Sequence, residues 1–290
     1  MLEIYTGSPI AVILIAGLLG LLVGSFLNVV AYRLPIIMQL RWHAEAQEIQ
    51  ATPRPNVEQP FNLSVPRSAC PNCGHKITAI ENVPVLSYLV LRGKCRGCRT
   101  PISLQYPAVE LLTGILSMIV AWKFGFSWQT LAALALLWSL VALADIDRST
   151  QLLPDDITLP LVWLGIICNI PDAGLFTDLK SSVLGAIGGY MILWTIFQVF
   201  KLITGKEGMG FGDFKLLAAL GAWLGWQYLP TIILISSFFG ALVGITLKLT
   251  NKNNGDAPIP FGPFLAAAGF AALIWGEQLN DLYLSTSGLQ

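Results

Sequence analysis

Residues 10–32, IAVILIAGLLGLLVGSFLNVVAY, determine what kind of protein this is. A helix needs about 20 mostly apolar residues to cross the hydrocarbon core of a bilayer, and the strongly polar members of this stretch are Ser25 and Asn28. No Lys or Arg precedes it and no small-residue cleavage site ends a short apolar core, which argues against a cleavable signal peptide. We therefore expect a membrane-spanning helix here.

The composition extends this expectation to the whole chain. The 290 residues are 54% hydrophobic and only 12% charged, against roughly 25% charged in soluble domains. A disordered chain is excluded and a soluble enzyme is disfavoured. Acidic and basic residues balance at 17 each, so no basic field points to nucleic acid. We predict an all-α membrane protein with about eight spans: 10–32, 105–122, 128–144, 157–171, 181–200, 214–226, 229–248 and 260–276.

The distribution of Lys and Arg predicts the orientation, because these residues favour the cytoplasmic side of a membrane. If the polar segment 35–104 is cytoplasmic, all of the 17 Lys and Arg except Lys123 and Lys180 fall on that side. We therefore expect a first transmembrane helix (1–34), a cytoplasmic loop (35–104) and a multi-span bundle (105–290), with both termini facing away from the cytoplasm.

Four of the five cysteines form two Cys-x-x-Cys pairs in this loop, Cys70 with Cys73 and Cys95 with Cys98. Their spacing is close to that of tetrathiolate zinc sites. Four protein ligands leave no open position for a substrate, so the zinc ion that we predict is structural. Redox-active dithiols and unligated thiols are the alternatives, although stable disulfides are rare in a reducing cytoplasm.

Two acidic clusters border predicted spans, where ionisable side chains are costly and invite a functional interpretation. Asp145 and Asp147 follow the third span, and Asp213 follows a glycine-rich turn before the sixth. Two aspartates that share a proton can act as base toward water and acid toward a leaving amine. A plain structural interpretation also exists, in which Asp213 caps a helix and Asp145 or Asp147 pairs with Arg148.

These motifs resemble those of a known family. The GxGD sequence at residues 210–213 resembles the signature of the type IV prepilin peptidases, which are membrane aspartic proteases. GxGD alone is short and unspecific, but the resemblance covers nearly the whole chain through six segments in order. These are GSFLNVVAYRLP (24–35), the CxxC…CxxC loop, PISLQYPAVELLTG (101–114), DIDRSTQLLPDDITLP (145–160), KEGMGFGDFKLL (206–217) and PIPFGPFLAAAG (258–269).

The resemblance implies a bifunctional enzyme of the bacterial inner membrane. Such enzymes cleave the leader peptide of type IV prepilins and type II secretion pseudopilins at the cytoplasmic face, after a Gly and usually before a Phe. They then methylate the new N-terminal amine with S-adenosylmethionine. The family's first catalytic aspartate lies eight residues before the Asp of the Leu-Leu-Pro-Asp element, here Asp155, which selects Asp147. Its neighbour Asp145 is the competing assignment, and the second catalytic aspartate is Asp213.

The methyltransferase activity has no motif of its own in this chain. No glycine fingerprint follows a predicted strand, so the residues that bind S-adenosylmethionine are not assigned. Two other classes of function remain to be weighed. A transporter or channel would use the two aspartates as ion or proton ligands, and a non-catalytic scaffold would use the zinc loop to dock a cytoplasmic assembly protein. Prepilins, pseudopilins and membrane lipid are the expected partners.

Overall fold

A computed structural model describes residues 8–49, 61–171, 174–250 and 259–287. Helices dominate these ranges, which contain no strand; the pairs Ala69–Lys76 and Lys94–Pro101 form isolated β-bridges. The predicted all-α fold is confirmed.

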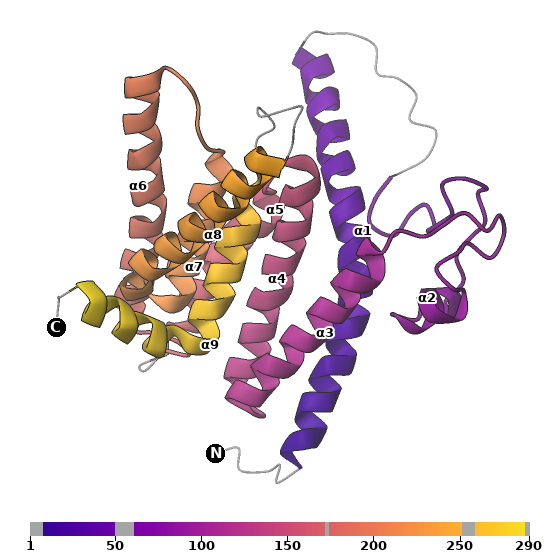
Figure 1. The fold of residues 1–290 in the computed structure, drawn as a ribbon, viewed down its shortest axis with the longest axis horizontal. Coiled ribbons are helices and arrows are strands. Elements are labelled where there is room, and N and C mark those ends of the chain that lie inside the picture. Colours follow the sequence, from indigo (N-terminus) through magenta and orange to yellow (C-terminus); the bar gives the residue numbers. More distant parts are fainter. Residues whose placement is uncertain (1–7, 50–60, 172–173, 251–258, 288–290) are drawn as a thin grey trace. The chain divides into compact units, whose positions relative to one another are not determined.

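Eight helices of the described chain overlap the eight predicted spans (Figure 1). They are α1 (Pro9–Ile49), α3 (Gln105–Phe124), α4 (Trp128–Thr150), α5 (Asp155–Cys168), α6 (Leu179–Thr204), α7 (Phe211–Leu224), α8 (Leu229–Thr250) and α9 (Gly262–Ser287). Within the described ranges, five of them are long and apolar enough to cross a membrane: α1, α3, α4, α6 and, with the turn before it, α8. The protein is therefore a multi-pass membrane protein.

The segment Met1–Phe126 forms one compact unit, in which α1 packs along α3. Small residues bring the two helices together, as membrane helices require when lipid offers no hydrophobic drive to association. A side chain at Gly20 would overlap Ser117, and one at Gly24 would overlap the backbone of Glu110. The loop between α1 and α3 carries the short helix α2 (Leu86–Val90) and the 3₁₀ turn Ile80–Asn82.

Helix α1 is longer than the predicted span, because it continues through Pro35 to Ile49. A proline inside a helix removes one backbone hydrogen bond. The residues that follow, 36–49, contain no glycine and are mostly good helix formers, so the helix continues beyond it. The first part of the predicted loop is thus helical.

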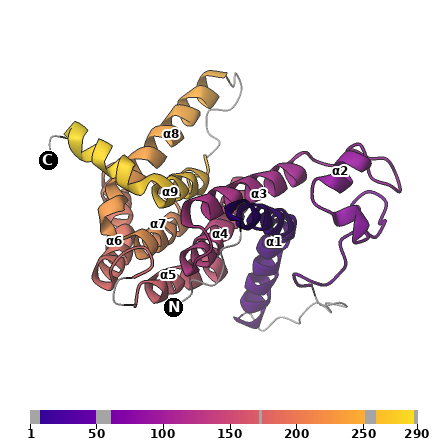
Figure 2. The same ribbon diagram turned by 90° about the horizontal axis from the view of Figure 1, so that it is seen from below.

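The segment Ser127–Gln290 forms the second unit, with α7 at its centre (Figure 2). Helices α5, α6 and α9 all contact α7, and its residues from Asp213 to Leu224, apart from Lys215, are buried. At Gly185 of α6, an added Cβ would overlap Gly221 O of α7, so the two backbones touch. This packing fixes the start of α7 relative to its neighbours.

Helix α4 ends later than the sequence predicts. Ser127 accepts a hydrogen bond from Thr130 N–H at its start, and Gln151 adopts a left-handed conformation (φ 56°) at its end. The helix therefore includes Asp145 and Asp147, which we had expected just after the span.

Candidate active site

Asp147 lies in the last turn of α4 and is 6% exposed. Its Oδ2 accepts a hydrogen bond of 2.8 Å from the backbone N–H of Gly262, the first residue of α9. A Cβ at Gly262 would lie only 2.7 Å from the same oxygen. Glycine is therefore required where the α9 backbone approaches this carboxylate.

Asp145 has a different environment although it is only two residues away. Its Oδ1 accepts a 2.9 Å hydrogen bond from Arg148 Nη2, which forms an ion pair one helical turn along α4. Residues two apart on a helix do not face the same side. The structure thus gives Asp145 a local charge partner and directs Asp147 toward α9.

Asp213 lies in the first turn of α7, three residues after the extended residue Gly210 that caps the helix. It is 7% exposed, and its Oδ1 has no hydrogen-bond partner among the described residues. The Asp147 carboxylate is near enough to act on it electrostatically. A buried oxygen without a partner costs free energy. An ordinary helix cap would use this oxygen in a hydrogen bond, so its lack of a described partner points to a functional group.

The residues around Asp213 hold its turn in place. A Cβ at Gly212 would lie 2.6 Å from Leu153 Cβ, so the glycine lets this turn pack against the segment before α5. Lys215 Nζ binds both carboxylate oxygens of Asp155, at 2.6 and 2.8 Å. This ion pair joins the first turns of α5 and α7. The link between the two buried carboxyl groups is electrostatic, since Asp147 of α4 acts on Asp213 of α7. Such a pair is chemically suited to general acid–base catalysis.

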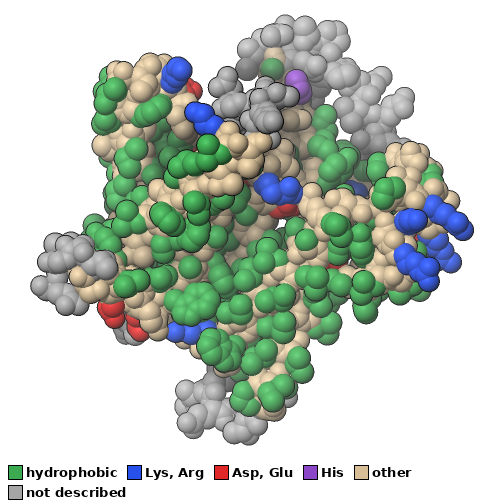
Figure 3. All heavy atoms as spheres, viewed as in Figure 1, with side chains coloured by type: hydrophobic (Ala, Val, Ile, Leu, Met, Phe, Trp, Pro, Cys, Tyr) green, Lys and Arg blue, Asp and Glu red, His purple; other side chains and the backbone are tan. Residues whose placement is uncertain are grey.

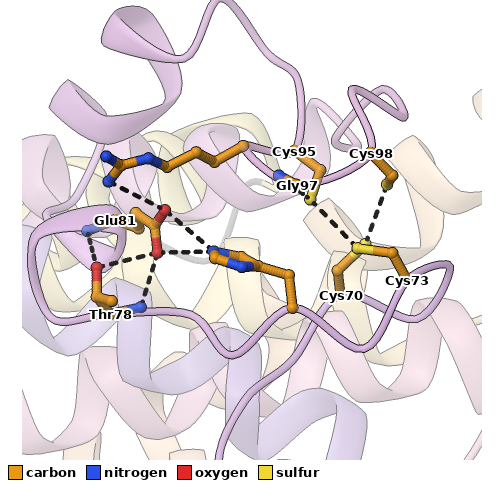
Figure 4. A network of polar contacts seen from close by, with 9 residues as sticks. Cys70, Cys73, Thr78, Glu81, Cys95, Gly97 and Cys98 are labelled. Atoms are coloured by element: carbon orange, nitrogen blue, oxygen red, sulfur yellow. Dashed lines mark hydrogen bonds and ion pairs between the residues drawn. The ribbon is translucent and has the colours of Figure 1, made fainter.

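The four predicted metal ligands come together in the first unit (Figure 4). Their sulfur atoms all lie within 4.8 Å of one another, with 3.8 Å between Cys70 and Cys98 and 3.9 Å between Cys73 and Cys95. The four cysteines form a cluster that could hold a metal ion.

The pKa values within the cluster differ in the way expected of thiols that share protons. The Thr100 hydroxyl and backbone N–H, together with Asn72, lower the pKa of Cys98 to about 5. A backbone hydrogen bond near His75 lowers the pKa of Cys73, but lost hydration and the three other thiols outweigh it and raise that pKa to about 11. A bound cation would displace such shared protons, because metals bind thiolates.

A second network supports the turn beside the cysteines (Figure 4). The backbone N–H and hydroxyl of Thr78 hold the pKa of Glu81 at about 2, and His75 adds to the effect. His75 Nε2 lies 3.2 Å from both Glu81 oxygens, and Arg96 is 3.7 Å from Oε1. His75 thus contacts Glu81, while the four cysteines converge without it.

Comparison with known proteins decides the family. Residues 18–124 match the bacterial peptidase A24 N-terminal domain, and residues 134–245 match the type IV leader peptidase family. The chain belongs to the type IV leader peptidase family. Several relatives carry the name prepilin leader peptidase/N-methyltransferase, and three of them match over nearly the full length. That of Stutzerimonas stutzeri is 53% identical over 99% of both chains. That of Aeromonas salmonicida is 52% identical over 99% of this chain and 98% of its own. That of Pseudomonas aeruginosa is 53% identical over 100% of this chain and 99% of its own. No solved structure matches the chain.

Three features of this leader peptidase's site escaped the motif analysis. The contact from Gly262 to Asp147 joins residues 115 positions apart, and the pair of Lys215 with Asp155 joins residues 60 apart. The third is Glu81, which contacts His75 and Arg96 beside the cysteine cluster and belongs to none of the motifs. The segment that contains Gly262 belongs to the family pattern, but a single sequence does not reveal a contact over such a distance along the chain.

Proposed function

We propose that this protein removes the leader peptide of type IV prepilins and type II secretion pseudopilins, and then methylates the new N-terminal amine. The observation that carries the first activity is the pair of buried carboxyl groups, Asp147 and Asp213, at the ends of α4 and α7. The names of the relatives support both activities. They give no support to a transporter or channel.

The chemistry follows from two carboxyl groups that share one proton. The ionised aspartate accepts a proton from water as the water oxygen attacks the scissile carbonyl carbon. The protonated aspartate then gives its proton to the leaving amine as the C–N bond breaks. The backbone N–H of Gly262 favours a charged Asp147, whereas the unpartnered Oδ1 of Asp213 suits the protonated role. We therefore assign Asp147 as the base that accepts the proton of water and Asp213 as the acid that protonates the leaving amine.

The proposed location is the bacterial inner membrane, with the dyad at the cytoplasmic face. The balance of Lys and Arg supports this orientation. Helix length supports the depth of the site, because α7 has only 14 residues, or about 21 Å, against about 30 Å of hydrocarbon. The start of α7 can therefore lie at the membrane edge, where water and a peptide bond next to a transmembrane segment meet.

The cysteine cluster fits zinc. Zinc–sulfur bonds of about 2.3 Å in a tetrahedron place the sulfur atoms about 3.8 Å apart. Two of the observed separations are 3.8 and 3.9 Å, and an all-thiolate set suits zinc or an iron–sulfur centre. We propose one structural zinc ion held by Cys70, Cys73, Cys95 and Cys98.

S-adenosylmethionine would supply the methyl group of the second reaction. The part of the chain that the structure describes contains no glycine-rich strand-to-helix turn of the kind that binds nucleotide cofactors. We therefore assign no residues to this cofactor.

The test is purified protein in detergent, mixed with a prepilin and followed by intact mass. We expect loss of the leader, and with S-adenosylmethionine a further gain of one methyl group. Asp147→Asn and Asp213→Asn should each lower the rate of leader cleavage by at least about 10³-fold, while leaving the protein folded. Asp145→Asn is the matched control, because Asp145 pairs with Arg148, and should remain active. Cleavage by either dyad variant would refute the assignment.

A further inference from the structure

Helix α2 presents its apolar side to the outside of the loop. Leu86, Leu89 and Val90 are 61, 63 and 81% exposed, whereas Ser87 and Tyr88 are half-buried. Positions i, i+3 and i+4 lie on the same side of a helix. A helix on a water-facing loop buries its apolar side, and an exposed apolar patch signals an interaction site. The arrangement in α2 is the reverse of the usual one.

This orientation is imposed by specific contacts. Val85, the residue before α2, has a φ of 60°, which is a strained conformation for a β-branched residue. Its backbone N–H donates a 2.7 Å hydrogen bond to Oε2 of Glu110, a buried side chain of α3. On the other side of the helix, Tyr88 packs so closely on Gly93 that a Cβ there would lie 2.7 Å from its hydroxyl. Backbone strain is thus accepted to keep the apolar side outward.

The position of α2 suits a membrane surface. The loop that carries it connects α1 to α3, both of which are long and apolar enough to span the bilayer. Figure 1 shows α2 beside the α1–α3 pair, near the level where α3 begins, and not beyond the end of α1. Leu104, the last residue before α3, is 71% exposed as well. The loop therefore exposes apolar side chains both on α2 and at the start of a membrane span.

The charges next to α2 are complementary to anionic lipid. Four exposed basic residues follow it directly: Arg92, Lys94, Arg96 and Arg99. Of these, Arg96 also pairs with Glu81. Figure 3 shows Lys and Arg gathered at the outer edge of the loop beside hydrophobic side chains. Two positive charges would be enough to offset a tetrathiolate zinc site, so this cluster exceeds that need. Basic residues beside an inserted apolar face are the usual features of binding to an anionic bilayer surface.

We propose that the apolar face of α2 inserts into the headgroup region of the membrane that α1 and α3 span, and that the adjacent basic residues bind anionic lipid headgroups. The inference is independent of the proposed catalytic activities. It makes the cysteine-bearing loop a module held at the bilayer surface and not a freely tumbling domain.

The test places a photoreactive p-benzoylphenylalanine in the full-length protein in lipid nanodiscs, with adducts identified by mass spectrometry. We expect lipid adducts when Val90 is replaced. The positive control is Leu242 of the spanning helix α8, which is half-exposed, and the negative control is the exposed loop residue Ser64. Adducts at 242 but none at 90 would overturn the proposal, as would adducts at 90 that join only protein segments, which would identify a protein partner instead.

The charge component has its own measurement in nanodiscs that mix phosphatidylglycerol with phosphatidylcholine. Each basic residue near an anionic surface contributes about 1 kcal/mol, or about fivefold. We expect the ratio of phosphatidylglycerol to phosphatidylcholine among the adducts at position 90 to exceed the bulk ratio by at least about that factor. The double variant Arg92→Gln, Lys94→Gln should lower this ratio severalfold toward the bulk ratio, because two of the four basic residues remain. A ratio equal to bulk in the protein without these substitutions would overturn the role of the basic residues.

Discussion

Gly262 is a position at which one added atom, a Cβ, would collide with the Asp147 carboxylate. Its N–H donates to Asp147 Oδ2 at 2.8 Å, and a Cβ would lie 2.7 Å from that oxygen. We expect Gly262→Ala to displace the carboxylate and to lower kcat of leader cleavage by about 10²-fold, the usual effect of a 1 Å misplacement at a catalytic centre. KM should change little, because the residue contacts the dyad.

The matched control is Gly240→Ala in α8, where the nearest atom to an added Cβ is Phe264 Cδ2 at an ordinary 3.6 Å. This variant should retain its activity. Both proteins should show similar unfolding temperatures in detergent. Full activity in Gly262→Ala would show that Asp147 does not depend on this hydrogen bond.

The two neighbouring aspartates show what a sequence can resolve at this scale. Motif spacing selected Asp147 over Asp145, but hydropathy and charge could not, because both residues border the same predicted span. The two residues differ only in their partners, which are Arg148 on the same helix for Asp145 and Gly262 for Asp147. The contact between Gly262 and Asp147 depends on how α9 packs on α4, and a local sequence pattern does not predict this packing.

At the level of elements, hydropathy located all eight long helices but not their ends. Apolar length is a property of each segment alone, so it could be read directly. The end of α4 depends on the left-handed conformation of Gln151, and the extension of α1 depends on residues that tolerate the loss of one hydrogen bond at Pro35. The cysteine cluster could be predicted because the spacing within each Cys-x-x-Cys pair is a local property of the sequence.

The contact between α6 and α7 gives a prediction about stability. An added Cβ at Gly185 would overlap Gly221 O, whereas one at Gly188, on the same helix, would meet only the end of the Leu229 side chain at 3.3 Å. We expect Gly185→Ala to lower the free energy of unfolding by about 2–3 kcal/mol through overpacking. Gly188→Ala should be neutral or slightly stabilising, because alanine is the better helix former.

Thermal unfolding of the two variants in the same detergent measures this difference. Equal unfolding temperatures would mean that α6 and α7 separate at little cost. Because Asp213 lies at the start of α7, we also expect Gly185→Ala to reduce leader cleavage, whereas Gly188→Ala should not.

For the molecule as a whole, the clustered cysteines and the proposed catalytic aspartates lie in different units. The four clustered cysteines lie in Met1–Phe126, and both Asp147 and Asp213 lie in Ser127–Gln290. A structural metal stabilises the unit that provides its ligands. The loss of the proposed zinc should therefore affect the first unit and leave the dyad in place, since the contact described between Asp147 and Gly262 lies within the second unit.

We expect Cys95→Ser to lose bound zinc and to make the loop 61–104 sensitive to limited proteolysis, while kcat/KM for leader cleavage stays within about threefold, since no group that performs the chemistry is removed. Cys168→Ser is the matched control, because this fifth cysteine lies in α5, outside the cluster. Metal content, proteolysis and intact mass of the product are measured on the same samples.

A large loss of cleavage with an intact second unit would show that the first unit takes part in proteolysis. Retained cleavage with lost methylation would instead assign the second activity to the first unit, because zinc would then be needed only for the reaction that follows leader removal.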